Sequence, residues 1–146
     1  MTAGRLIGIA RAPAIGAPLE ELRHASVSLE RGIEGDARGA KPRRQVTILF
    51  REGWEEACNE LGVTLPWVTR RANLLVEGVE RPRAAGGRIR IGDVVLEVML
   101  ETKPCELMNR ACAGLRAALT PDWRAGVCCN VARSGQIALA DTVEIL

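Results

Sequence analysis

Short β-rich apolar runs, many of them soon followed by glycine, proline or aspartate, constrain the fold of this chain more than any other feature. Runs rich in valine, isoleucine and leucine are typical of strands that lie in a sheet. We expect strands at residues 6–10, 25–29, 45–50, 73–76, 88–91, 94–100, 127–131, 136–139 and 142–145. The spacing predicts only two helices, one over 52–61 that Gly62 closes and one over 106–119 that Pro121 stops.

The order of these segments indicates the fold class. Strands and helices do not alternate regularly, which disfavours a doubly wound parallel sheet. We therefore expect a mainly β fold, a β-barrel of mixed and mostly antiparallel strands with two or three peripheral helices. A chain of 146 residues, of which 47% are hydrophobic, is long enough to form one such domain over residues 1–146.

Composition excludes several classes of partner. Aromatic residues make up only 3% of the chain, and the net charge is +2, so neither base stacking nor a basic surface indicates a nucleic-acid partner. No apolar stretch approaches the length that spans a membrane, and the N-terminus has no long apolar region of a signal peptide. The five cysteines are odd in number and lack CxxC spacing, which favours reduced thiols and a cytoplasmic protein without a membrane partner.

The segment 102–108, Thr-Lys-Pro-Cys-Glu-Leu-Met, places a cysteine between a predicted strand and a predicted helix. Pro104 stops the strand, and Cys105 falls near the helix N-cap, where free N–H groups and the helix dipole favour an anion. Lys103 adds a positive charge nearby, so we expect the thiolate, which is the reactive form, to be favoured. Cys105 could carry sulfur, bind a soft metal or act as a nucleophile. A buried cysteine that packs as a small hydrophobe fits the local sequence equally well.

The other cysteines carry weaker signals. Cys58 and Cys112 are best interpreted as core residues, and the adjacent Cys128 and Cys129 point to opposite faces of a strand. We expect all of them to be free thiols, because a disulfide between neighbouring residues is strained. The single histidine, His24, lies far from every cysteine in the sequence, which disfavours a structural zinc site.

Basic residues precede two of the predicted strands. Lys41, Arg43 and Arg44 come before one strand, and Arg70 and Arg71 come before another. In a barrel such strand ends can meet at one mouth, where arginine suits the bidentate recognition of phosphate. Arginines that simply project into solvent are the alternative for each residue taken alone.

Two further features lie close to these basic residues. Residues 32–39 form a glycine-rich loop whose N–H groups could line an anion, but the loop lacks the order of a nucleotide-binding phosphate loop. An ordinary loop is the favoured interpretation. Asn73 starts a predicted strand, where asparagine is uncommon, so its amide could orient a ligand or tie down a loop.

Taken together and in this order, six segments resemble the MOSC domain, the module found at the C-terminus of molybdenum cofactor sulfurases. They are residues 32–36, 44–49, 71–79, 87–93, 103–105 and 124–137. The resemblance spans about residues 5–146. It implies a barrel-like β fold, and it matches Cys105 to the characteristic cysteine of the family, which carries sulfur or contacts the molybdenum of a pterin cofactor.

The resemblance also implies which residues would bind that cofactor, an anionic pterin. Cys105 would be the catalytic or molybdenum-facing thiol, and the candidate cofactor-binding residues are Lys103, Arg70, Arg71, Asn73, Arg44, Arg38 and Asp36. No pyridoxal phosphate is expected on this chain, because that cofactor belongs to the separate desulfurase domain of the fused enzymes. The chain departs from the family pattern at Arg38, near which a histidine usually follows the Gly-Asp pair. Arginine cannot shuttle protons or act as a neutral ligand, but Arg38 could hold phosphate.

Three functions remain open at this level. The first is a domain that binds the molybdenum cofactor or carries sulfur, with a cysteine desulfurase or a molybdoenzyme as its partner. The second is a component of a molybdenum-dependent reductase that acts on N-hydroxylated substrates. The third is a non-catalytic adaptor for molybdoenzyme maturation, for which Cys105 would be dispensable.

Overall fold

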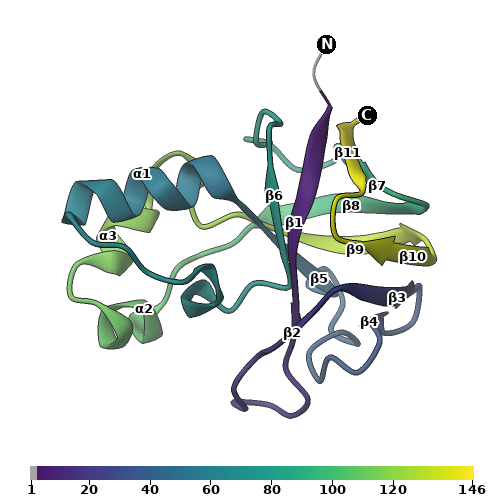
Figure 1. Cartoon of the computed structure of the whole chain (residues 1–146), viewed down its shortest axis with the longest axis horizontal. Coiled ribbons are helices and arrows are strands. Elements are labelled where there is room, and N and C mark those ends of the chain that lie inside the picture. The colour runs from purple at the N-terminus through teal and green to yellow at the C-terminus, as the bar shows by residue number, and fades with distance from the viewer. Residues whose placement is uncertain (1–2) are drawn as a thin grey trace.

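The computed structural model describes residues 3–146. A β-barrel makes up one side of the molecule and a layer of helices the other (Figure 1). The strands are β1 (Gly4–Arg11), β2 (Glu20–Leu22), β3 (His24–Ser28), β4 (Gly32–Ile33), β5 (Val46–Phe50), β6 (Leu74–Glu77), β7 (Arg88–Ile91), β8 (Val94–Glu101), β9 (Val127–Arg133), β10 (Gly135–Ala138) and β11 (Thr142–Ile145). The helices are α1 (Arg51–Leu61), α2 (Glu106–Ala111) and α3 (Leu115–Leu119), with short 3-10 turns η1 (Trp67–Arg70) and η2 (Pro121–Trp123).

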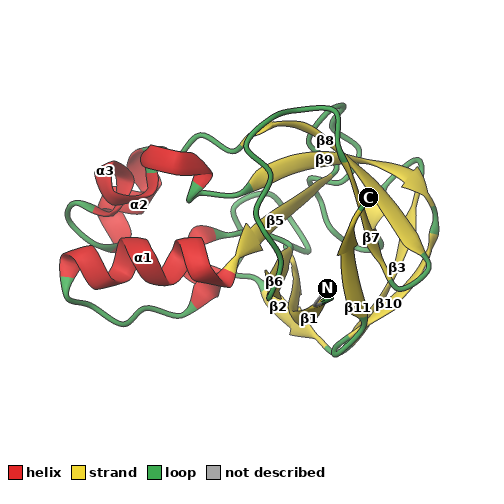
Figure 2. Ribbon diagram, turned by 90° about the horizontal axis from the view of Figure 1, so that it is seen from above, coloured by secondary structure: helices red, strands yellow, loops and turns green. Residues whose placement is uncertain are grey.

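Seven strands close into the barrel in the order β11-β7-β8-β9-β5-β6-β1, and β2 extends the sheet beyond β1. Pairing of β1 with β11, at Gly4 opposite Val143 and Arg5 opposite Thr142, closes the ring. Only β5 and β6 are parallel, and the other neighbours in the ring are antiparallel. Figure 2 shows this ring of strands with all three α-helices gathered on one side of it. The prediction of a mainly β, mixed barrel with peripheral helices is confirmed.

Strand β5 lies between two apolar cores. Ile48 and Phe50 are fully buried in the barrel core, which also receives Val27 and Ile137 from the small three-stranded sheet β10-β3-β4. Leu49, which points to the opposite face, packs with the helices. A strand buried on both faces reads as a continuous apolar run, and residues 46–50 do so with Thr47 as the one polar exception.

The predicted helix over 106–119 is wrong as a single element. The structure divides it into α2 and α3, because Cys112 takes an extended backbone and Gly114 a left-handed one, with φ of 86°. The glycine-rich segment predicted as a loop contains the short strand β4, and β2 was not predicted. Within residues 3–146, no helix has the length and apolar character needed to cross a membrane.

Candidate functional site

A pocket of about 300 Å³ lies where three chain segments meet. The β4–β5 loop forms one wall, the turn from η1 into β6 forms the second, and the connection from β8 into α2 forms the third. The lining residues are Arg38, Lys41, Arg44, Thr47, Arg70, Arg71, Asn73, Thr102, Cys105, Leu107 and Met108. A larger hollow of about 440 Å³ lies beside β11, but glutamates are its only charged lining residues and no cysteine lines it. The smaller pocket therefore brings together Cys105 and several of the basic residues that the sequence analysis singled out.

Cys105 occupies the N-cap position of α2, as the sequence predicts. It has an extended backbone, and its carbonyl accepts a hydrogen bond from the Met108 N–H at 2.9 Å. Its thiol makes no capping hydrogen bond, and the residue is exposed. Met108 lies three residues further along the helix and so lines the same pocket, a neighbour that helical spacing could have indicated.

Arg70 is the buried cation of the pocket, with only 8% of its surface exposed. Its Nε donates to the carbonyl of Ala125 at 3.0 Å, while its Nη2 has no hydrogen-bond partner among residues 3–146. Burial lowers the pKa of Arg70 to about 10, although attraction to Cys128 and Cys105 opposes that shift. The guanidinium therefore stays charged at neutral pH. A buried, charged donor without a partner is costly unless a ligand supplies an acceptor.

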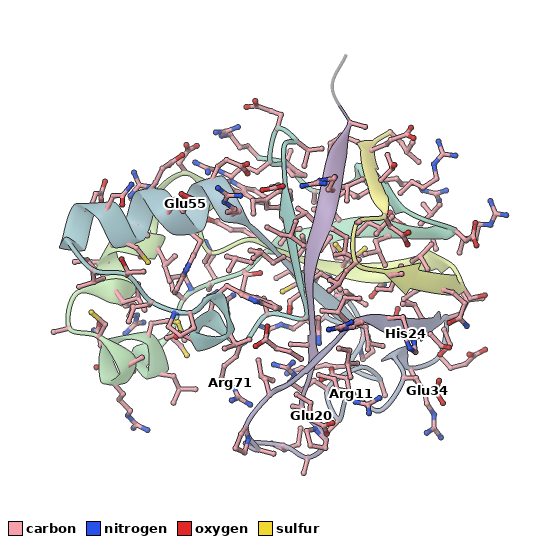
Figure 3. All side chains as sticks on the ribbon, viewed as in Figure 1. Arg11, Glu20, His24, Glu34, Glu55 and Arg71 are labelled. Carbon is pink, nitrogen blue, oxygen red and sulfur yellow. The ribbon has the colours of Figure 1, made fainter. Side chains whose placement is uncertain are left out.

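Arg71 follows in a left-handed conformation, with φ of 62°. Its Nη2 donates to the carbonyl of Ala17 at 2.7 Å, so the side chain reaches toward the β1–β2 loop (Figure 3). Its own carbonyl accepts a hydrogen bond from Nη1 of Arg38 at 2.8 Å. Arg38 also donates through Nε and Nη2 to Oδ1 of Asp36, at 3.3 and 3.2 Å. Arg38 thus holds the turn that carries Arg71.

Asp36 is buried and does not line the pocket. Its Oδ1 accepts the backbone N–H of Ala12 at 2.8 Å in addition to the bonds from Arg38, which joins the β4–β5 loop to the end of β1. Its Oδ2 is buried without a partner in the described residues. The structure thus places Asp36 behind Arg38, and any effect it has on a ligand passes through that side chain.

Asn73 is 2% exposed and joins three chain segments. Its Oδ1 accepts hydrogen bonds from both the N–H and the hydroxyl of Thr47, at 3.0 and 3.2 Å. Its Nδ2 donates to the carbonyl of Ala10 at 3.2 Å. The amide therefore ties β5 and β1 to the start of β6, which is the second of the two roles considered for it. Thr47, which the sequence analysis did not single out, lies at the pocket as the partner of this amide.

The remaining predicted cations divide into two groups. Lys41 and Arg44 line the pocket from the β4–β5 loop and form no salt bridge among the described residues. Lys103 does not line the pocket, and its side chain is 80% exposed and paired with Glu101 at 3.1 Å. The positive charge beside the Cys105 pocket therefore comes from the arginines and Lys41 and not from Lys103.

The other four cysteines are free thiols and lie largely inside the protein. Cys129 belongs to the barrel core, and burial raises its pKa; burial likewise raises the pKa of Cys58. Cys128 lies on the opposite face of β9, with its Sγ 3.4 Å from the Thr102 hydroxyl. No cluster of three or more histidine, cysteine or acidic side chains that could hold a metal ion exists within the described residues. Cys105 is thus the one exposed thiol of the five.

Comparison with known proteins gives one family and several similar structures. A sequence model of the MOSC domain matches residues 35–144. The YuaD protein from Bacillus subtilis has a similar structure, with a TM-score of 0.81 and 20% identity over 99% of this chain and 96% of that chain. YiiM from Escherichia coli has a TM-score of 0.71 and 18% identity over 97% of this chain and 69% of its own. YiiM from Geobacillus stearothermophilus has a TM-score of 0.70 and 12% identity over 98% and 73%.

At these identities, the structural likeness establishes a shared fold. No curated protein sequence matches the chain. The family model covers all three segments that form the pocket, from the β4–β5 loop to the start of α2.

Proposed function

Because this chain belongs to the MOSC domain family, we propose that its cationic pocket binds the phosphate-bearing pterin of the molybdenum cofactor and that Cys105 acts there as a sulfur carrier or as a metal-facing thiol. The family is associated with binding of that cofactor and with sulfur transfer. One observation carries the proposal. The charged Nη2 of Arg70 is buried without a partner in a pocket that also contains an exposed thiol.

The residues of the pocket fit such a ligand. Arg70, Arg71 and Arg44 would hold the anionic part of the ligand, because guanidinium groups match the geometry and charge of phosphate. Leu107 and Met108 offer an apolar wall to a ring system. The thiol of Cys105 suits molybdenum, which prefers sulfur ligands. When bound, the cofactor would supply a redox-active molybdenum centre held by its dithiolene.

Sulfur transfer to Cys105 needs only a persulfide donor, which a cysteine desulfurase would provide. The Cys105 thiolate attacks the outer sulfur of the donor persulfide, and a new S–S bond forms on Cys105. The S–S bond of the donor breaks, and the donor cysteine leaves as a thiolate. One thiolate replaces another, so the exchange consumes no further oxidant or reductant. The exposure of Cys105 makes it accessible to a donor of protein size.

The first test measures sulfur on the protein. Wild type, Cys105→Ser and the matched control Cys112→Ser are incubated with a cysteine desulfurase and cysteine and then analysed by intact mass. Wild type and the Cys112 variant are expected to gain the mass of one sulfur atom that a reductant removes, whereas Cys105→Ser gains none. Equal gain by Cys105→Ser would contradict the carrier role, since it would place the sulfur on another thiol.

The second test measures the cofactor. Protein purified from a host that makes molybdopterin is compared with Arg70→Gln, and with Arg88→Gln, which removes an exposed arginine on β7 away from the pocket. We expect Arg70→Gln to retain molybdopterin about ten- to a hundredfold less well, because it loses a charged hydrogen bond. If the protein retains molybdenum but accepts no sulfur, a reductase component that acts on N-hydroxylated substrates becomes a better account than a sulfur carrier. If neither property depends on Cys105 or Arg70, a non-catalytic adaptor is the better account.

A further inference from the structure

The pocket has an uncompensated positive charge that is unusual for this molecule. Most arginines elsewhere have carboxylate partners, as Arg81 and Arg83 before β7 and Arg124 after η2 do. Of the five cations that line the pocket, only one is paired with a carboxylate of the described residues, through the contact of Arg38 with Asp36. The other four are Lys41, Arg44, Arg70 and Arg71.

Arg70 is buried at the pocket, whereas Lys41 and Arg44 are exposed at its rim. Arg44 and Arg38 line the same pocket as Arg70, and their charges add to burial in lowering the pKa of Arg70. Like charges gathered near a low-dielectric wall cost free energy unless a counter-charge is present. The unpartnered Nη2 of Arg70 adds a buried donor that the protein itself does not satisfy.

The cations come from two separate walls. Lys41 and Arg44 lie on the β4–β5 loop, whereas Arg70 and Arg71 lie on the turn from η1 into β6. Cys105 lies on the third wall, at the start of α2. If a metal binds at Cys105, its positive charge offsets the negative charge of the thiolates that hold it. Those thiolates therefore do not explain why the other two walls carry cations.

A single phosphate monoester carries a charge of about −1.5 to −2 at neutral pH, which offsets about half of four positive charges. A second, directly linked phosphate adds negative charge, for which Lys41 and Arg44 on the other wall offer partners. We infer that the pocket recognises a diphosphate, with one phosphate at Arg70 and Arg71 and the other at Lys41 and Arg44. This inference rests on the proposed function, since it specifies the anionic part of the ligand in the same pocket.

An esterified diphosphate and free pyrophosphate share this chemistry, so the test includes both. Binding of inorganic phosphate, inorganic pyrophosphate and ADP is measured by calorimetry at constant ionic strength. We expect pyrophosphate to bind at least about tenfold more tightly than phosphate, because it engages both cationic walls. An affinity for ADP within about threefold of that for pyrophosphate would identify an esterified diphosphate as the ligand. A much weaker affinity for ADP would identify free pyrophosphate, and both results uphold a diphosphate site.

Variants separate the two walls. Lys41→Gln is expected to remove most of the difference in affinity between pyrophosphate and phosphate, while it changes the affinity for phosphate less than about twofold. Arg70→Gln is expected to weaken both anions about tenfold or more, and the control Arg88→Gln should change neither by more than about twofold. Equal affinity for phosphate and pyrophosphate overturns the diphosphate inference alone. Binding of neither anion, or binding that Arg70→Gln leaves unchanged, overturns the proposed phosphate pocket as well.

Discussion

Arg70 and Asn73 are both buried polar residues of the pocket, but they use their polar atoms in opposite ways. Asn73 finds its partners inside the protein, on Thr47 and Ala10. Arg70 uses its Nε for Ala125 and leaves Nη2 without a partner in the described chain. Since buried polar groups are normally satisfied, the first residue serves the fold and the second is available to a ligand.

Replacing Asn73 by alanine therefore tests stability and not binding. The change leaves the N–H and hydroxyl of Thr47 and the carbonyl of Ala10 without their side-chain partner. We expect Asn73→Ala to lower the free energy of unfolding by about 2–4 kcal/mol, measured by urea denaturation. Asn59→Ala, on the exposed face of α1, should cost less than about 0.5 kcal/mol. Similar small losses for both variants would show that the Asn73 hydrogen bonds contribute little.

The sequence could indicate the types of these residues but not their partners. The position of Cys105 before a helix follows from Pro104 and from local spacing alone, and the structure has it there. Lys103, only two residues away in the chain, was expected beside the thiol, yet it pairs with Glu101 outside the pocket. Side-chain direction depends on tertiary neighbours, so proximity in the chain did not predict proximity in space.

Among the secondary-structure elements, the longer strands were predictable, whereas the short strands β2 and β4 and the interruption of the second helix were not. Strands β5, β7, β8 and β11 lie within one or two residues of the predicted ranges, because apolar runs bounded by turn residues are a strong local signal. The segment 106–119 has helical spacing throughout, although Gly114 interrupts it. A glycine within a helical pattern is compatible with both a continuous helix and a break, and here packing of α3 against α1 accompanies the break.

Gly114→Ala tests that break. The backbone of Gly114 has φ of 86°, which a residue with a Cβ adopts only at a cost, and the added Cβ would lie 3.1 Å from Leu61. We expect a loss of about 1 kcal/mol or more in the free energy of unfolding. Gly87→Ala is the matched control, because Gly87 has no positive φ and nothing within 4 Å of an added Cβ. Equal stability of the two variants would mean that α2 and α3 can merge without strain.

An ion-pair network joins the helical layer to the segment before β7, and it makes stability depend on pH. Hydrogen bonds from Arg83 and then Arg81 hold the pKa of Asp122 well below its usual range, and a hydrogen bond from Arg81 likewise lowers the pKa of Glu56. A carboxyl whose pKa is lower in the folded protein stabilises it above the unfolded pKa, about 4 for these groups. That contribution is lost as the pH falls through the folded pKa.

Asp122→Asn should therefore be less stable than wild type at pH 7, and the difference should shrink as the pH falls below about 4. Urea midpoints measured from pH 7 down to pH 2 give this comparison. Glu30→Gln, which removes an exposed carboxylate without a salt bridge in the described residues, should track wild type throughout. A difference between Asp122→Asn and wild type that is constant with pH would contradict the role of the ionised carboxylate.

For the whole molecule, closure of the barrel brings together residues that no local pattern connects. Strand β1 pairs with β11 at the other end of the chain, and the pocket draws on loops around residues 38–44, 70–73 and 102–108. The sequence suggested that basic strand ends could converge, but which of them do so depends on strand order and register. That information lies in long-range pairing, for which the sequence has only weak signals.

The two cores share β5, so we expect the barrel and the helical layer to unfold together. Leu6, on the closing strand β1, is fully buried in the barrel core. Trp54 and Trp67 belong to the helical core, and Trp123 packs against the barrel core. Leu6→Ala should lower the free energy of unfolding by about 2–5 kcal/mol, and the half-exposed Leu29→Ala by less than about 0.5 kcal/mol.

Because Ile48 and Leu49 point to opposite cores from adjacent positions, loss of the barrel removes the support of the helices. The urea transitions of Leu6→Ala followed by far-UV circular dichroism and by tryptophan fluorescence should coincide. A fluorescence transition of which a part stays at the wild-type midpoint, while the dichroism transition moves, would show two independent folding units.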